Sequence, residues 1–174
     1  MNISFVVYGK SQPAGSKRAF ALKRRDGSLV TRGDGSPVVN VTDDNAKSRS
    51  WKQDVAAAAR REYSGPLVDG ALAVHVTIYR PRPKGHFRSN GALSKAGVEA
   101  PWPTGRPDVL KLVRAIEDSL TGVLWRDDAQ IVREPIEKRW GEPARVEILV
   151  LDAPAPDAAP FAAHVSRAVP EPPF

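Results

Sequence analysis

The sequence predicts a small single domain of the α/β (α+β) class, built from a mixed β-sheet and two main helices. A chain of 174 residues with 41% hydrophobic and 26% charged residues suits one globular domain with a real core. Residues 3–8, 71–80, 131–140 and 145–151 alternate between apolar and polar side chains, which indicates strands. Residues 42–63 and 108–122 carry apolar side chains at helical spacing between start and stop signals. We expect the domain to span residues 1–151 and a Pro/Ala-rich tail to follow at 152–174.

The N-terminal third is the basic part of the chain. After the strand at 3–8, a Gly/Pro loop leads to Lys17 and Arg18. Asp-Gly pairs at 26–27 and 34–35 are hairpin signals, so we expect short strands near 18–24, 28–32 and 37–41, with Arg24 exposed. These cations either blunt exposed strand edges or form a basic ribbon along phosphates. Both interpretations stay open.

The middle of the chain holds a helix, a strand and a long basic segment. Thr42, Asp43 and Asp44 are helix-start residues, so the first helix is expected over 42–63. The strand at 71–80 has the clearest alternation. Residues 80–105 look irregular and carry five cations, Arg82 and Lys84 among them, before their only acid, Glu99. Such a loop is either an arm that orders on nucleic acid or simply disordered.

Charge and composition narrow the classes of function. The net charge is +6, and residues 1–63 hold 12 Lys/Arg against 6 Asp/Glu. This points to a polyanionic partner, although a high pI also serves solubility alone. The absence of cysteine excludes thiol catalysis and cysteine-ligated metals. No apolar run is long enough to span a membrane and no signal peptide is evident, so we expect a cytoplasmic protein without membrane contact.

The stretch 105–132 carries the candidate chemistry. Asp108 stands at the predicted start of the second helix, and Asp127 and Asp128 follow its end. The link from Gly122 to Asp128 is long enough, at roughly 23–25 Å when extended, to bring these carboxylates back beside Asp108. Clustered carboxylates suit a hard cation such as Mg²⁺, which can activate water against a phosphodiester. The alternative is that Asp108 caps the helix while Asp127 and Asp128 form a solvated turn.

The same stretch contains a set of residues with a specific spacing: Arg106, Pro107, Asp108, Leu112, Ala115, Asp118, Leu120, Gly122, Trp125, Asp127, Asp128, Gln130 and Ile131. It resembles the central motif of the RusA-like family of Holliday junction resolvases, the crossover junction endodeoxyribonucleases. The resemblance implies a homodimer that binds branched DNA and nicks four-way junctions symmetrically with Mg²⁺ or Mn²⁺. It also implies that Asp108 and Asp128 are metal ligands, that Asp127 supports them, and that Arg114 replaces an essential lysine.

The resemblance and the charge pattern together give a set of expected DNA-binding residues: Lys17, Arg18, Arg24, Arg82, Lys84, Lys111 and Arg114. The sequence departs from the family at Leu110, where a second Asp is expected, and at Lys111, where Asn is expected. Glu117 could substitute, but it lies about 10 Å further along the helix than Leu110. A protein that binds branched DNA without cutting it is therefore the alternative function. A nucleoid-associated protein and a phage-encoded one in a bacterial host are both compatible with the family.

Overall fold

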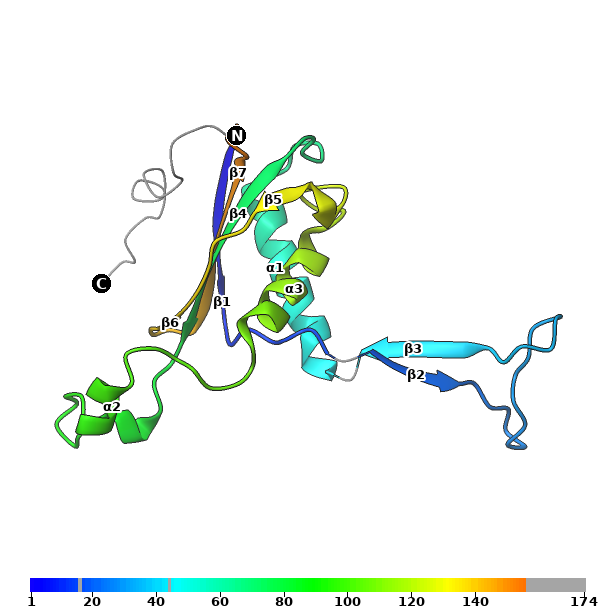
Figure 1. Cartoon of the computed structure of the whole chain (residues 1–174), viewed down its shortest axis with the longest axis horizontal. Helices are drawn as coiled ribbons and strands as arrows, with labels where there is room; N and C mark the ends of the chain where they lie inside the picture. Colours follow the sequence, from blue (N-terminus) through cyan, green and yellow to red (C-terminus); the bar gives the residue numbers. More distant parts are fainter. Residues whose placement is uncertain (16, 44, 156–174) are drawn as a thin grey trace.

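A mixed β-sheet forms the centre of the computed structural model, which describes residues 1–15, 17–43 and 45–155. The sheet has the order β1–β7–β4–β5, and β6 also pairs with β4. Its strands are β1 (Asn2–Tyr8), β4 (Leu72–Arg80), β5 (Ile131–Arg133), β6 (Ile136–Trp140) and β7 (Arg145–Asp152). The helices α1 (Ala46–Glu62) and α3 (Val109–Leu120) lie on one face of the sheet (Figure 1). The predicted fold class is confirmed.

The register of β4 fixes the two ends of the sheet. β7 pairs antiparallel with both β1 and β4, whereas β5 and β6 run parallel to β4. Ile131 pairs with Leu72 near one end of β4, and Lys138 pairs with Ile78 near the other. The predicted single strand at 131–140 is wrong in one respect, because it breaks after Arg133. Pro135 has no N–H to donate there, so the ladder is interrupted between β5 and β6.

One hydrophobic core joins the sheet to the two helices. The α3 side chains of Leu112, Val113, Ile116 and Leu120 are buried against it, together with Trp51 and Val55 of α1. Asn45 caps α1 and accepts a 3.2 Å hydrogen bond from the Lys47 N–H. The predicted helix start at 42–44 was too early, since a strand continues to Asp43 and delays the helix.

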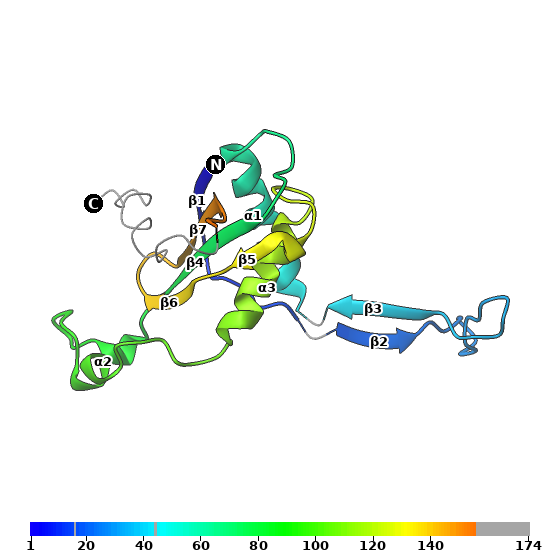
Figure 2. The same cartoon turned by 45° about the horizontal axis from the view of Figure 1, so that its top comes forward.

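The arm, residues 17–43, projects away from the sheet (Figures 1 and 2). Its base is an antiparallel ribbon of β2 (Lys17–Ala21) and β3 (Val39–Asp43). At its tip, backbone hydrogen bonds join three residues in a ring: Leu22 N–H to Val38 O (2.9 Å), Val30 N–H to Leu22 O (2.9 Å) and Val38 N–H to Val30 O (2.7 Å). No strand forms near 28–32, where one was predicted. This segment makes only isolated β-bridges and connects two turns.

A second projection, the lobe (residues 81–103), contains the 3₁₀ helix η1 (Lys84–His86) and the short helix α2 (Lys95–Glu99). It extends from the end of β4, on the side of the molecule away from the arm (Figure 1). Ser94 caps α2, because its hydroxyl accepts a 3.2 Å hydrogen bond from the Gly97 N–H. The prediction of an irregular segment at 80–105 is therefore corrected: polar caps and packing order most of it.

The C-terminal strand ends at Asp152, whose carboxylate pairs with the N-terminal ammonium group. Most of the tail predicted at 152–174 lies outside the described residues. Within the ranges that the structure describes, no helix combines the length and the apolar content that a membrane span requires.

Candidate active site

Helix α3 carries the predicted site residues on its solvent side. Its buried face anchors it to the core, so the opposite face presents Leu110, Lys111, Arg114 and Asp118 to solvent. Asp118 is held by a 2.7 Å ion pair with Lys52 of α1. The charges are segregated along this face: the cations Lys111 and Arg114 occupy the first half of the helix, and the acids Glu117 and Asp118 the second half.

The N-terminal end of α3 places Asp108 among cations. Asp108 occupies the predicted cap position, but its carboxylate accepts no capping hydrogen bond, so the expected cap interaction is absent. Its nearest charge is the Lys111 ammonium at 3.8 Å. Lys138 of β6 donates to the carbonyls of Gly105 (3.0 Å) and Pro107 (3.3 Å), and thereby fastens the turn that precedes Asp108.

A pocket of about 410 Å³ opens beside Asp108. It lies between the start of α3 and the loop that follows β1, and the Ala14 N–H donates a 2.7 Å hydrogen bond to the Lys111 carbonyl across this junction. Arg106 and Lys111 line it together with the Asp108 carboxylate. A pocket with two cations and one exposed carboxylate has the groups needed to hold a phosphate beside a metal ligand.

Asp127 and Asp128 lie in a tightly built turn beyond the C-terminal end of α3. Asp127 caps the 3₁₀ helix η2 (Asp128–Gln130) and accepts a 2.9 Å hydrogen bond from the Ala129 N–H. The Gln130 side chain completes the capping box by accepting from the Asp127 N–H at 3.1 Å. Asp127 is therefore engaged within the turn that holds Asp128, and its role in supporting the metal ligands stays a prediction.

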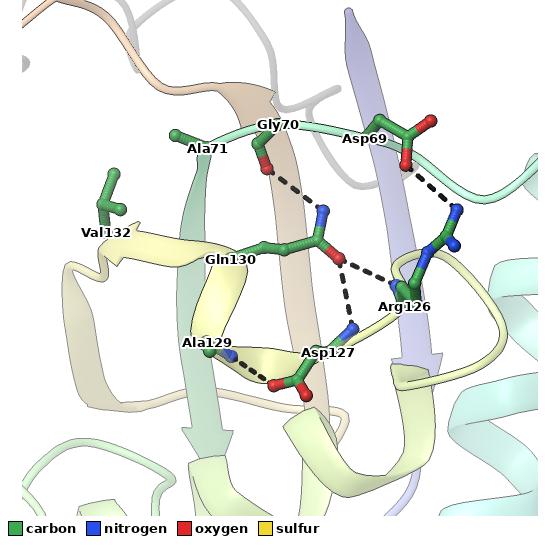
Figure 3. Close-up of a pocket in the computed structure, with 8 residues that line it drawn as sticks. All are labelled: Asp69, Gly70, Ala71, Arg126, Asp127, Ala129, Gln130 and Val132. Atoms are coloured by element: carbon green, nitrogen blue, oxygen red, sulfur yellow. Dashed lines mark hydrogen bonds and ion pairs between the residues drawn. The ribbon is translucent and has the colours of Figure 1, made fainter.

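Gln130 also fastens this turn to the sheet, as Figure 3 shows. Its amide nitrogen donates to the carbonyls of Val68 (2.9 Å) and Gly70 (3.1 Å), just before β4. Arg126 adds a 3.3 Å ion pair with Asp69 at the rim of a second pocket, drawn in Figure 3, which measures about 440 Å³. These contacts hold Asp128 at the end of the sheet where β4 begins.

An acidic pair lies next to Asp128. Burial, followed by the neighbouring Glu117 carboxylate and a hydrogen bond between the two groups, raises the pKa of Glu134 to about 7. Burial and then the charge of Asp128 raise the pKa of Glu117 as well. Among the described residues, Glu134 Oε1 is buried without a hydrogen-bond partner. Sequence reasoning treated Glu117 as a distant substitute and missed Glu134, whose only signal was its position before Pro135.

The structure separates Asp108 from Asp128 and so corrects the expectation that one chain brings them together. Asp108 starts α3, whereas Asp128 lies near Glu117, which is about 13 Å further along the helix axis. The sheet gives a similar separation. Lys138 holds the turn before Asp108, and Ile131 directly follows η2. These two residues pair with positions of β4 that lie about 20 Å apart. Within the described ranges, no three acidic or histidine side chains form a group that could hold a metal ion.

The predicted DNA-binding residues fall into three regions. Lys17 and Arg18 begin β2 at the base of the arm, and Arg24 is exposed at its tip. Lys111 and Arg114 lie on the exposed face of α3, and Lys84 is exposed on the lobe. Arg82 differs from the rest, because its guanidinium donates to the carbonyls of Gly97 (2.8 Å) and Ala100 (3.1 Å) inside the lobe. These contacts favour a structural role for Arg82.

A comparison with known protein families identifies the family of this chain. The family model described as "Endodeoxyribonuclease RusA" matches residues 28–151, which include the second half of the arm, both main helices, η2 and the strands β4 to β7 up to Leu151. The chain therefore belongs to the RusA endodeoxyribonuclease family, a family of nucleases that act on branched DNA junctions. The resemblance seen in the sequence is confirmed.

A curated relative is similar over nearly its whole length. The chain is 31% identical over 153 residues to "Uncharacterized protein YqaN" of Bacillus subtilis (strain 168), and the match covers 88% of this chain and 98% of that protein. The similarity extends well beyond the motif at 105–132, so the two proteins share a domain rather than a local pattern.

Proposed function

We propose that this protein is a Mg²⁺-dependent endodeoxyribonuclease, also able to use Mn²⁺, that acts as a homodimer and resolves four-way DNA junctions by paired symmetric nicks. Family membership supports the DNA-cleaving class and the branched substrate. The observation that carries the finer proposal is the placement of Asp108 and Asp128 at opposite ends of α3. One chain holds two halves of an acidic site, and a second copy is needed to join them.

A two-fold partner would complete the site from both chains. In an isologous contact whose two-fold axis is perpendicular to α3, the two helices run antiparallel, so Asp108 of one chain would face Asp128 of the other. The charge pattern of α3 favours this arrangement, because its basic first half then faces the acidic second half of the partner helix. Leu110 supports it too: its side chain is 69% exposed in the single chain and would be covered by the partner helix.

The residues of the joined site fit a hard divalent cation. Carboxylate oxygens are the ligands that Mg²⁺ and Mn²⁺ accept, and Asp108 and Asp128 would hold the ion. Burial and then the negative charge of Asp128 raise the pKa of Glu117, so a cation bound at Asp128 would relieve part of this repulsion. When bound, such an ion supplies Lewis-acid activation of water and stabilisation of charge on a phosphodiester.

The chain's own residues would bind and orient the DNA. Asp127 holds the turn that presents Asp128, and Lys138 holds the turn that presents Asp108. Lys111 and Arg114 would contact the phosphate next to the scissile one, where a guanidinium can bind two oxygens at once. Lys17, Arg18 and Arg24 of the arm, with Lys84 of the lobe, would follow the phosphates of the duplex arms in a salt-dependent contact.

A second candidate function is branched-DNA binding without cleavage. Leu110 favours it, because an apolar side chain stands where the family motif resembled by this stretch has a carboxylate. The two candidates differ in a junction-nicking assay run beside a gel shift in chelator. Binding without nicks in either Mg²⁺ or Mn²⁺ would favour the non-cleaving function.

The test of the joined site uses two inactive variants. Asp108→Asn and Asp128→Asn are each expected to bind four-way junctions but not to cut them, and Asp54→Asn on the exposed side of α1 is the matched control. Mixing the two variants should restore nicking of one strand, because a mixed dimer contains one site with both carboxylates intact. A mixture that exchanges subunits yet stays inactive would contradict the shared site, and full cleavage by either variant alone would remove that residue from it.

A further inference from the structure

The lobe exposes an unusual amount of apolar side chain. Val98 is 64% exposed and Trp102 57%, while Phe87 and Leu93 are 40% and 37% exposed. Large apolar side chains that stay accessible on a projecting element commonly mark a contact surface. Trp102 stands between two prolines, Pro101 and Pro103, which restrict the backbone on either side of it. The lobe therefore presents an aromatic ring from a stiff support.

The lobe is fixed to the body of the protein. The Arg82 guanidinium lies 5.3 Å from the centre of the Trp140 ring of β6, and Trp140 donates a 2.9 Å hydrogen bond to the Ala100 carbonyl. His86 meets the same ring edge to face at 5.4 Å. Gly97 packs so closely that an added Cβ would lie 2.3 Å from the His86 carbonyl oxygen. This packing sets the orientation of the lobe relative to the end of β6.

The charge of the lobe favours a polyanionic partner. Lys84, Arg88 and Lys95 are all exposed on the lobe, and Glu99 is its only acid. Glu99 lies 3.8 Å from Lys95, which leaves the other two cations without an acidic counterpart in the lobe. A protein-binding apolar patch is typically depleted in lysine at its centre. A lobe that exposes both an aromatic ring and cations without an acidic counterpart in the lobe has instead the composition of surfaces that bind single-stranded nucleic acid.

We propose that the lobe is a branch-point reader, in which Trp102 stacks on a base left unpaired where DNA strands exchange while Lys84 and Arg88 bind the flanking phosphates. This inference rests on the proposed function. Trp102 precedes Asp108 by six residues on a continuous segment, which can span at most roughly 20–22 Å, so the lobe and the end of α3 that carries a proposed metal ligand can engage the same junction. The lobe thereby couples recognition of the branch to the position of the scissile phosphate.

Stacking would also give the lobe a role in DNA binding that differs from the role of the arm. Phosphate contacts from the arm are available on any duplex, and they carry no information about branching. Stacking on a base face requires a base that has left the helix, and it tolerates any sequence because every base has such a face. Trp102 thus gives selectivity for branched over linear DNA, while the arm gives affinity for both.

The experiment measures binding of the full-length protein, in chelator, to a four-way junction with 2-aminopurine at the branch point and to a linear duplex of the same sequence. Trp102→Ala should weaken junction binding roughly tenfold, in the range found when a stacking aromatic is removed, and leave duplex binding unchanged. Trp102→Phe should retain most of the affinity. Val98→Ala is the matched control, since it removes exposed apolar surface from the same lobe without a ring. Fluorescence of the 2-aminopurine should be quenched by the wild type and by Trp102→Phe, but not by Trp102→Ala.

Other results would overturn the proposal in distinguishable ways. Equal losses for Trp102→Ala on junction and duplex, or a loss for Val98→Ala as large as that for Trp102→Ala, would exclude stacking as the source of selectivity. A change in the mass of the protein in solution on Trp102→Ala would make the lobe a contact between copies of the chain instead. Failure of the wild type to bind junctions at all would refute the proposed function itself. None of these measurements depends on cleavage.

Discussion

Neutralising Glu134 should stabilise the protein above neutral pH but not in acid. The raised pKa means that the folded chain keeps a proton on Glu134 that the unfolded chain has already released. The free energy of unfolding therefore falls as pH rises from 4.5, the ordinary pKa of the group, to about 7. The full destabilisation is present above that pH. Glu134→Gln removes the ionisation while keeping the shape and a hydrogen-bond donor towards Glu117.

The magnitude follows from the size of the pKa change. A rise from 4.5 to about 7 corresponds to about 3 kcal/mol against the ionised form. Glu134 is only partly buried, so solvent screening reduces this to about 1–2 kcal/mol. Urea unfolding in chelator should give Glu134→Gln that advantage at pH 8 and none at pH 4.5. Glu142→Gln, at the exposed turn before β7, is the control. An equal difference at both pH values, or no gain at pH 8, would refute the account of this acidic pair.

Two further changes test the site and the lobe. Leu110→Asp places a carboxylate in the first turn of α3, which holds no acid. The position is exposed in the single chain, so the stability of the monomer should change by less than about 1 kcal/mol, while the carboxylate added to the proposed shared site should lower the Mg²⁺ concentration that nicking needs. A metal titration of nicking checks this, and an equal effect of Leu110→Asn would show that charge is not the cause. Arg82→Met removes two charge-assisted hydrogen bonds and a ring contact, together worth a few kcal/mol, so amide exchange should accelerate in the lobe and not in the sheet. Weakened DNA binding with unchanged exchange would instead restore Arg82 to the DNA-binding set.

The sequence was sufficient for elements with strong periodicity. The alternation in β4 and β7 and the apolar stripe of α3 come from side chains close together in the chain, so their type was predictable. The separation of Asp108 from Asp128 was not predictable, because the distance that a linker can span is only an upper limit. Gln130 decides where the chain actually goes, and its partners at Val68 and Gly70 lie about 60 residues earlier.

The same physical reason explains two other differences. Arg82, in a Pro-rich basic run, resembles a surface cation, yet its acceptors at Gly97 and Ala100 lie 15 and 18 residues later. Glu134 resembles one more residue of a strand, and only the fold places its carboxyl against that of Glu117. Local patterns report which face a residue prefers, whereas a partner distant in sequence decides what that residue does.

The ring of backbone hydrogen bonds at the arm tip makes the length of the arm adjustable in discrete steps. Leu22 and Val30 are both hydrogen-bonded to Val38. The Leu22 N–H donates to the Val38 carbonyl, and the Val38 N–H donates to the Val30 carbonyl. If residues 23–30 were absent, Leu22 could make both bonds itself, and the pairing of Ala21 with Val39 below would keep its register. Eight residues can thus be gained or lost at this point without disturbing the ribbon beneath. Such an arrangement lets an arm lengthen by duplication of one turn while the body of the protein stays the same.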